Sequence, residues 1–227
     1  MCGIVGCIGR DDEPLEVLMG GLRSLEYRGY DSAGIALGPI VETLRRSGEL
    51  DALEDALTTD TPTGTFGIGH TRWSTHGPPT KQNAHPHTDE SGQVAVVHNG
   101  IIENHTQLKA DLEDRGVSFT SDTDTEVVPH LIAQALARGE APETAFHTTV
   151  DQLEGSYAIA VIIDGDDTVY AARQGSPLVV GVDDDSTYLA SDVPAFIEHT
   201  RDVVFLEDGH RVIATPDGYT VCDEDRN

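Results

Sequence analysis

The residue with the clearest potential for chemistry is a cysteine in the second position, directly after Met1. A small second residue is the usual circumstance in which the initiator methionine is removed, and removal would leave a free α-amine beside the thiol. Such an amine has an unperturbed pKa of about 7.7–8.0, so it can act as a general base near neutral pH. A terminal nucleophile activated by its own amine is an established arrangement in covalent catalysis. Taken alone, Cys2 is better explained as a cysteine buried in a first strand.

Five histidines lie within 29 residues and raise the question of a metal site. They are His70, His76, His85, His87 and His98. No pair has the HExxH spacing and no cysteine accompanies them, so we expect no metal. Cys2, Cys7 and Cys222 make an odd count of three cysteines with no CxxC pair, which argues against a disulfide framework.

Hydrophobic periodicity predicts the elements that would carry these residues. Apolar runs indicate strands at 2–8, 32–37, 42–48, 65–74, 93–102, 157–164, 168–173, 177–182, 187–191, 202–207, 210–215 and 219–223. Leucines every three or four residues indicate a helix that has Pro14 in its first turn and continues to Leu25. Further helices are expected at 50–59, 104–116, 123–139 and 141–156.

Two of these helices have candidate capping residues. Asn104 is a plausible N-cap of the first, and Asp124 or Thr125 of the second, in which Pro129 falls within the tolerated first turn. The strands form two sets around this central helical region, which favours an α+β layered domain over alternating βαβ units. The 227 residues suit one domain spanning 1–227.

The charge balance limits the partners. The chain has 14 basic and 40 acidic residues, a formal charge of −26, and Lys81 and Lys109 are its lysines. A surface this acidic would repel phosphate backbones, so we expect no nucleic acid. It suits a halophilic protein in a very salty cytoplasm, where screening removes the self-repulsion. No apolar run approaches a spanning helix, and the N-terminus lacks a basic segment, so we expect a cytoplasmic location and no membrane.

Six blocks in a fixed order carry a resemblance to a known family. They are CGIVG (2–6), LEYRGYDSAGIA (25–36), HTRWSTHG (70–77), HNGIIENH (98–105), TDTEV (123–127) and GSPLVVG (175–181). With them the chain resembles the glutaminase domain of the glutamine:fructose-6-phosphate aminotransferase (glucosamine-6-phosphate synthase) family, from Cys2 to about Cys222. These domains are class II glutamine amidotransferases. The resemblance implies a four-layer αββα sandwich of the N-terminal nucleophile hydrolase type.

The resemblance also implies the roles in catalysis. Cys2 matches the nucleophile that attacks the γ-carboxamide of glutamine, forms a thioester and releases ammonia, after which water completes hydrolysis to glutamate. Asn99 and the backbone N–H of Gly100 match the oxyanion hole, and an amide and a glycine N–H are suitable donors to an oxyanion. Alternatively, Asn99 and Gly100 form a simple hairpin turn.

Four further residues match positions that bind the α-carboxylate and α-amine of glutamine: Arg72, Thr75, His76 and Asp124. The chemistry agrees, since arginine can bind a carboxylate with two parallel hydrogen bonds and aspartate can pair with an ammonium. Arg72 could instead be a surface cation at a strand end, and Asp124 a helix cap.

Two supporting positions match less specific features of the family. Arg28 resembles an arginine that helps order the site near the nucleophile, and Trp73 resembles the tryptophan beside the ammonia exit path. The alternatives are a turn required for backbone geometry and a core tryptophan.

The implied activity is that of a glutaminase without cofactor, which supplies ammonia from L-glutamine for glucosamine-6-phosphate synthesis from fructose 6-phosphate. The sugar-phosphate isomerase domains of the family are absent from these residues, so we expect that the chain is either an excised domain or a subunit that works with a separate synthase as ammonia acceptor. Two alternatives remain open. One is the glutaminase domain of another class II member, such as an amidophosphoribosyltransferase or asparagine synthetase, and the other is a non-catalytic glutamine sensor.

Overall fold

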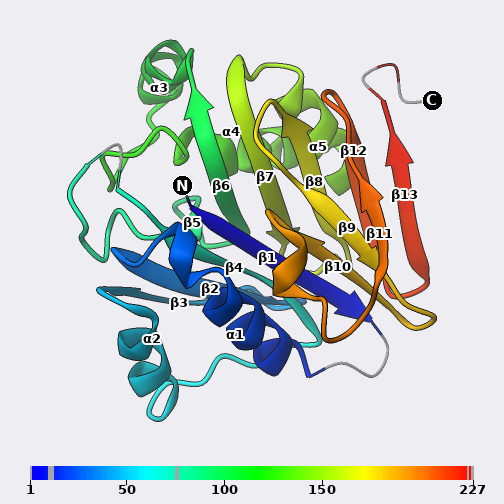
Figure 1. The fold of residues 1–227 in the computed structure, drawn as a ribbon. Helices are drawn as coiled ribbons and strands as arrows, with labels where there is room; N and C mark the ends of the chain where they lie inside the picture. The colour runs from blue at the N-terminus through cyan, green and yellow to red at the C-terminus, as the bar shows by residue number, and fades with distance from the viewer. Residues whose placement is uncertain (1, 10–12, 75–76, 224, 226–227) are drawn as a thin grey trace.

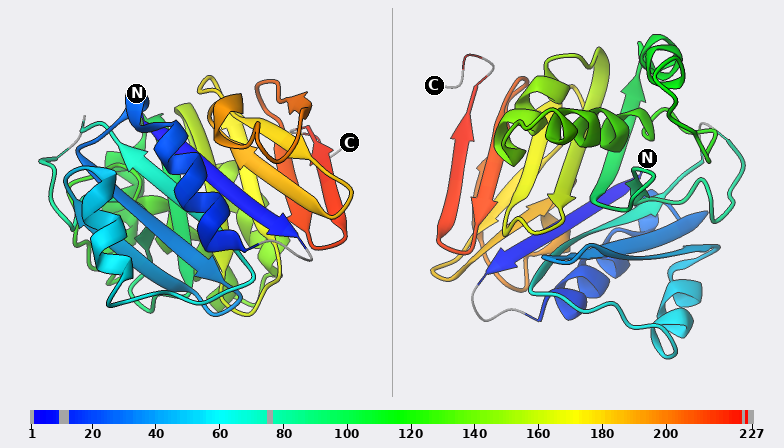
Figure 2. Two further views of the ribbon diagram at one scale, coloured as in Figure 1. Left: turned by 60° about the horizontal axis from the view of Figure 1, so that its bottom comes forward. Right: turned by 180° about the vertical axis from the view of Figure 1, so that it is seen from behind.

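The protein is built from two antiparallel sheets stacked face to face, with helices on the outer face of each (Figures 1 and 2). The computed structural model describes residues 2–9, 13–74, 77–223 and 225. The layers run helix, sheet, sheet, helix, which confirms the predicted αββα sandwich.

The seven-stranded sheet contains the N-terminal strand at its centre. In sheet order its strands are β11 (Asp202–Phe205), β9 (Val179–Val182), β10 (Ser186–Ala190), β1 (Gly3–Gly9), β4 (Phe66–Arg72), β2 (Ser32–Gly38) and β3 (Glu42–Ser47). Helices α1 (Pro14–Ser24) and α2 (Leu50–Leu57) pack on its outer face through Leu18, Leu22 and Leu53. Figure 1 shows both helices in blue and cyan beside β1 and β2.

The six-stranded sheet forms the second inner layer. In sheet order its strands are β13 (Gly218–Cys222), β12 (Arg211–Thr215), β8 (Val169–Gln174), β7 (Gly155–Ile163), β6 (Val94–Ile102) and β5 (His87–Thr88). Helices α4 (Val127–Ala137) and α5 (Pro142–Val150) cover its outer face, and α3 (His105–Glu113) packs beside α4. The right panel of Figure 2 shows these helices on the side opposite α1 and α2. None of the helices in the described ranges has the length and apolarity needed to cross a membrane.

Alternation along the strands separates three cores. Successive side chains of a strand point to opposite faces, so each inner strand contributes to two layers. On β1, Ile4 and Ile8 enter the layer between the sheets, whereas Val5 and Cys7 face α1. On the opposing sheet the inter-sheet layer contains many alanines, which allow the two sheets to approach closely. They are Ala95, Ala158, Ala160, Ala171 and Ala214.

Three short elements were not expected from the sequence patterns, and neither was the division of the C-terminal strands between the two sheets. The 3₁₀ turns Glu26–Arg28 and Val193–Ala195 and the two-residue strand β5 are too short for a periodic signal. The C-terminal strands also divide between the sheets: β9, β10 and β11 join the first, whereas β7, β8, β12 and β13 belong to the second.

The predicted helix at 141–156 is wrong at its C-terminal end. Helix α5 ends at Val150 and β7 begins at Gly155, whose φ of +119° is incompatible with a right-handed helix. The backbone carbonyl of Glu154 instead accepts a hydrogen bond from the N–H of Glu103.

Asn104 is the N-cap residue of α3, as predicted, but the capping hydrogen bonds expected of the Asn104 and Asp124 side chains do not form. The side chain of Asn104 makes no capping bond to α3; it donates to the Gln152 carbonyl and accepts from the Glu154 N–H, which joins this turn to the segment before β7. Helix α4 begins at Val127 rather than after Asp124, and the Asp124 carboxylate accepts the N–H of Ile102 on β6. Both polar side chains satisfy distant backbone groups instead of their own helix. Pro14 and Pro129 do lie in the first turns of α1 and α4, as predicted.

Two isoleucines near one hairpin test how much the core between the seven-stranded sheet and helices α1 and α2 contributes to the free energy of unfolding. Ile35 on β2 is completely buried against α1 and α2, whereas Ile40, in the following turn, is 72% exposed. Ile35→Ala should lower the free energy of unfolding by about 2–5 kcal/mol because it leaves a cavity. Ile40→Ala should change it by less than about 0.5 kcal/mol. Urea denaturation measures both, and equal effects would contradict this description of the core.

Candidate active site

The site lies where the apolar layer between the sheets gives way to polar side chains. On β4 the inward-facing residues Phe66 and Ile68 are followed, at the next inward position, by His70. On β6 the inward-facing residues Ala95 and Val97 are followed in the same way by Asn99. The antiparallel pairing of β1 and β4 places Gly3 opposite Thr71, so Cys2 lies beside the end of β4. Alternation and register thus bring three distant parts of the chain together.

The thiol of Cys2 is partly buried against the backbone of Trp73. Its Sγ accepts the Trp73 N–H at 3.2 Å and lies 3.5 Å from the Trp73 carbonyl. Burial raises the pKa of this thiol, and the hydrogen bond from Trp73 and the nearby Arg72 charge oppose that effect only in part. The thiol is therefore largely protonated at neutral pH, and its use as a nucleophile requires a base.

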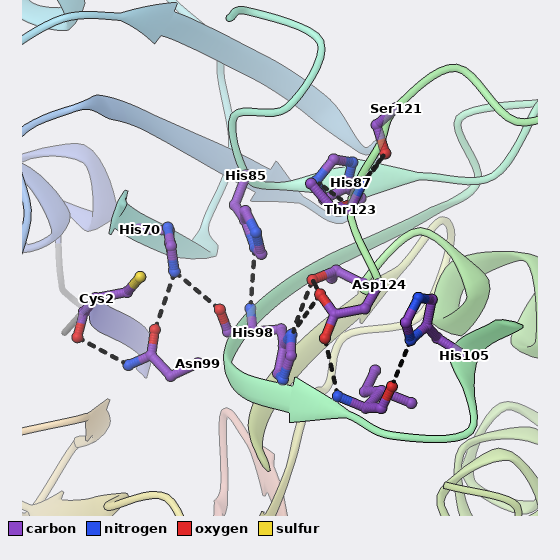
Figure 3. Close-up of polar contacts among 12 residues, drawn as sticks. Cys2, His70, His85, His87, His98, Asn99, His105, Ser121, Thr123 and Asp124 are labelled. Atoms are coloured by element: carbon purple, nitrogen blue, oxygen red, sulfur yellow. Dashed lines mark hydrogen bonds and ion pairs between the residues drawn. The ribbon is translucent and has the colours of Figure 1, made fainter. Parts of the chain in front are cut away.

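The side-chain amide of Asn99 faces Cys2. Its Nδ2 donates to the Cys2 carbonyl at 3.0 Å, while its Oδ1 lies 3.0 Å from Nε2 of His70 (Figure 3). The neighbouring Gly100 has a φ of +120°, and a Cβ there would lie 2.0 Å from the Ser156 carbonyl oxygen. Only glycine fits this position, so Asn99 and Gly100 are more than an ordinary hairpin turn; they lie within a continuous β6.

Two hollows adjoin Cys2. The larger has a volume of about 400 Å³ and is lined by Cys2, Arg28, Trp73, Asn99, Gly100, Ile101, Ser176 and Pro177. This volume is within the range of small-molecule sites, about 300–1,000 Å³. The smaller, about 20 Å³, lies between Cys2, Gly100, Arg72 and Asp124, and holds roughly one water molecule. Cys2 and Gly100 line both hollows.

Arg72 and Asp124 lie on this smaller recess, with their polar atoms bonded to the protein. The Arg72 guanidinium donates at 3.3 Å to the Ser74 hydroxyl and to the carbonyls of Gly77 and Pro78. Burial lowers the pKa of Arg72, although the negative groups nearby, including Asp124, oppose this. Asp124 accepts the Ile102 N–H at 2.8 Å. Of the predicted substrate-binding residues, Thr75 and His76 lie outside the described residues.

Arg28 and Trp73 both line the larger hollow, but Arg28 is paired elsewhere. Its guanidinium donates to Asp192 at 2.7 Å, and Asp192 also accepts the Tyr27 hydroxyl hydrogen bond. Trp73 is 43% exposed, and its ring packs edge-on against Tyr30 at 5.3 Å between centroids. Trp73 is therefore not a core tryptophan.

Four of the histidines form a buried cluster behind Asn99. The rings of His70 and His85 stack at 4.1 Å between centroids, and His85 also contacts His87 and His98. Burial lowers the pKa of His70 and His87 to about 3, and that of His85 well below its usual value, so these three rings are neutral near pH 7. Their nitrogens bond protein groups: His87 to Thr123, His98 to Thr125, and His70 to Asn99.

Several residues of the site were missed by sequence reasoning. Sequence reasoning treats the four clustered histidines only as possible metal ligands, although His70 and His98 begin two of the recognised blocks, which was a usable signal. Ser176 and Pro177 belong to a block used only for the resemblance. Asp192 carried no signal, since it meets Arg28 across 164 residues.

The fold and site define a class II glutamine amidotransferase domain with an N-terminal nucleophile hydrolase-like fold. The profile of the glutamine amidotransferase domain matches residues 70–198, and the chain belongs to this family.

Similar proteins agree with this assignment. The chain is 49% identical to glutamine–fructose-6-phosphate aminotransferase (isomerizing) of Methanothermobacter thermautotrophicus over 96% of its own length and 37% of that protein. It is 52% identical to the Symbiobacterium thermophilum protein of the same name, over 97% and 36% of the two chains. The chain thus spans less than two-fifths of these relatives. The structure of glutamine phosphoribosylpyrophosphate amidotransferase from B. subtilis superposes with a TM-score of 0.82 at 28% identity, covering all of this chain and 50% of that one.

The buried histidines predict acid sensitivity. In the unfolded chain they bind protons below about pH 6.5, whereas His70 and His87 in the folded chain stay neutral until about pH 3. The folded state then binds fewer protons, so stability is complete above about pH 6.5 and is lost as the pH falls. Each such histidine lowers the free energy of unfolding by at most about 1.4 kcal/mol for each pH unit of acidification.

Urea denaturation between pH 7.5 and pH 4.5 measures this slope. His87→Phe, which removes one buried titrating ring, should make the free energy of unfolding less dependent on pH. His199→Gln, at an exposed position, serves as the control. An unchanged slope in the His87 variant would contradict the interpretation.

Proposed function

We propose that this domain hydrolyses L-glutamine to glutamate and ammonia through a thioester on Cys2. The observation that carries the proposal is the meeting of the Cys2 thiol, the Asn99 amide and Gly100 at one hollow. The 49–52% identity with glutamine-dependent relatives, over nearly all of the chain, supports it.

The raised pKa of the Cys2 thiol is consistent with amine-assisted attack. In the proposed reaction the α-amine of Cys2, freed by removal of Met1, takes the thiol proton while Sγ attacks the γ-carbonyl carbon. The oxygen that becomes negative accepts hydrogen bonds from Asn99 Nδ2 and the Gly100 N–H. Collapse of the tetrahedral intermediate breaks the C–N bond, and the ammonium of Cys2 returns the proton to the leaving nitrogen. Water then hydrolyses the thioester and restores the thiol.

Asn99 can serve in this way without giving up its present contact. Its Nδ2 carries two hydrogens, and one of them is used on the Cys2 carbonyl. The second is available for the substrate oxygen.

For substrate binding we propose that Arg72 and Asp124 bind the α-carboxylate and α-amine, with Thr75 and His76 contributing from the same segment as Arg72. The recess beside Arg72 and Asp124 has room for roughly one water, so binding requires the Arg72 side chain to exchange its contacts with Gly77 and Pro78 for the carboxylate. Arg28 would order the wall of the larger hollow through Asp192, and Trp73 would flank the path by which ammonia leaves.

The proposed acceptor is fructose 6-phosphate bound to a sugar-phosphate isomerase domain, giving glucosamine 6-phosphate. The names of the relatives at 49–52% identity support this branch over an amidophosphoribosyltransferase, whose solved structure is 28% identical. In this proposal residues 1–227 act as one glutaminase domain.

Replacing the nucleophile tests the reaction. Release of glutamate from glutamine by protein lacking Met1, as verified by intact mass, should fall by about 10⁴-fold or more in Cys2→Ala, because the covalent step is lost. Cys7→Ala, a buried cysteine of β1 facing α1, should keep the rate. A folded, processed protein that binds glutamine but releases no glutamate would favour the sensor alternative.

We further propose a cytoplasmic location and adaptation to high salt. The formal charge of −26 with 14 basic residues supports the second, since self-repulsion of this size destabilises the folded state unless salt screens it. Three consecutive exposed acidic residues, Asp183, Asp184 and Asp185, illustrate the crowding of like charge.

The temperature of unfolding should therefore rise between dilute buffer and molar KCl, as the Debye length shortens from about 10 Å at 0.1 M to about 3 Å at 1 M. The double variant Asp184→Asn, Asp185→Asn should show a smaller rise than the unsubstituted protein. Sucrose at matched osmolality controls for solute exclusion. Equal unfolding temperatures in low and high salt would overturn the proposal.

A further inference from the structure

One histidine joins the two sheets at the candidate oxyanion hole. His70 extends from β4 of the seven-stranded sheet, and its Nε2 lies 2.9 Å from the His98 carbonyl oxygen and 3.0 Å from Oδ1 of Asn99, both on β6 (Figure 3). The ring is completely buried. A single ring nitrogen of His70 therefore lies within hydrogen-bond distance of two acceptor oxygens on consecutive residues.

This geometry selects the tautomer of His70. Carbonyl oxygens only accept hydrogen bonds, so Nε2 must carry the proton. In the other tautomer the Nε2 lone pair would face two oxygens, and the Nδ1–H would be a buried donor, since Nδ1 has no hydrogen-bond partner among the described residues. Burial lowers the pKa of the ring to about 3, so the neutral Nε2–H form persists through the neutral range.

The tautomer in turn selects one orientation of the Asn99 amide. With Oδ1 toward the His70 N–H, Nδ2 is directed at Cys2, where it donates to the backbone carbonyl. The reversed amide would place NH₂ against the N–H of His70 and Oδ1 against the Cys2 carbonyl oxygen. Both contacts would be repulsive, so His70 and Cys2 together hold the amide hydrogens on the nucleophile side.

We propose that His70 is a positioning residue for glutamine hydrolysis, whose forked Nε2–H donation fixes the Asn99 amide with its hydrogens toward the carbonyl that Cys2 attacks. This inference rests on the proposed function of Cys2 and Asn99. His70 acts through Asn99 and needs no contact with substrate.

The surroundings of His70 hold its ring in place. His85 stacks on it with an angle of 14° between the ring planes, and the backbone N–H of His98 donates to Nδ1 of His85 at 3.2 Å. The titratable groups around the ring are His85, His87, His98 and Arg72. Protonation of His70 would add a positive charge beside Arg72, which disfavours the imidazolium further.

Two substitutions separate the hydrogen bond from the bulk of the ring. His70→Phe keeps a planar ring for stacking on His85 but removes the donor, and His70→Gln restores an N–H donor near the position of Nε2. His130→Phe, a buried histidine of α4 that contacts Phe119, is the matched control for placing phenylalanine at a buried histidine.

With glutamine as substrate, kcat of His70→Phe should fall about 10–100-fold, less than the 10²–10³-fold cost of losing an oxyanion-hole donor. KM should change little, and His70→Gln should recover most of the rate. In the Asn99→Ala background, His70→Phe should cause no further loss, because a residue that acts only through Asn99 has nothing left to position. Full activity in His70→Phe, or an undiminished additional loss in the double variant, would overturn the proposal.

A second measurement is independent of catalysis. Long-range ¹H–¹⁵N spectra of the unsubstituted protein should show His70 as the Nε2–H tautomer without titration between pH 8 and pH 5. An Nδ1–H tautomer, or titration in this range, would refute the positioning role even in an active enzyme. If the unsubstituted protein releases no glutamate but His70 has the expected tautomer, the proposed function fails while the hydrogen-bond arrangement stands.

Discussion

The layer between the two sheets constrains most of this structure. Each inner strand sends every second side chain into it, and the opposing sheet closes over it, so a polar group can enter only with its hydrogen bonds satisfied. Over most of the interface the side chains are apolar, and alanines on β6, β7 and β8 allow the two sheets to approach each other closely. At the end of β4 and β6 the same inward positions are occupied by His70 and Asn99, which satisfy each other across the sheets. The site is thus a continuation of the core pattern with polar residues.

Neutrality is the second requirement of this location. A charged imidazole in the cluster would pay the full cost of desolvation beside Arg72, and burial holds His70, His85 and His87 in the neutral form. A neutral ring offers one donor and one acceptor, so its hydrogen bonds have a direction. That direction passes from His70 to Asn99 and then to Cys2, and it makes the orientation of the amide a consequence of the packing.

The charged residues of the chain are mostly acidic, but arginines lie beside the site. Acidic residues outnumber basic ones by 40 to 14, yet arginines remain at the site, where Arg72 adjoins Cys2 and Arg28 pairs with Asp192. These cations are held by specific carbonyl and carboxylate partners. A general surplus of negative charge therefore coexists with local positive charge beside the thiol.

The sequence by itself determined the layered α+β class, nearly all of the longer strands and helices, and the site blocks around Cys2, Arg72, Asn99 and Asp124. These features are local: periodicity reports the buried face of one element, and a motif reports one segment. Only the tertiary structure decided which sheet each C-terminal strand joins, that the side chains of Asn104 and Asp124 bond distant backbone groups, and that Arg28 meets Asp192. It also decided the role of the histidines, since whether a ring is a metal ligand, a surface group or a buried donor depends on what the other sheet places against it. The sequence shows which side chains can donate a hydrogen bond, but which acceptor each one meets depends on the packing of residues that are far apart in the chain.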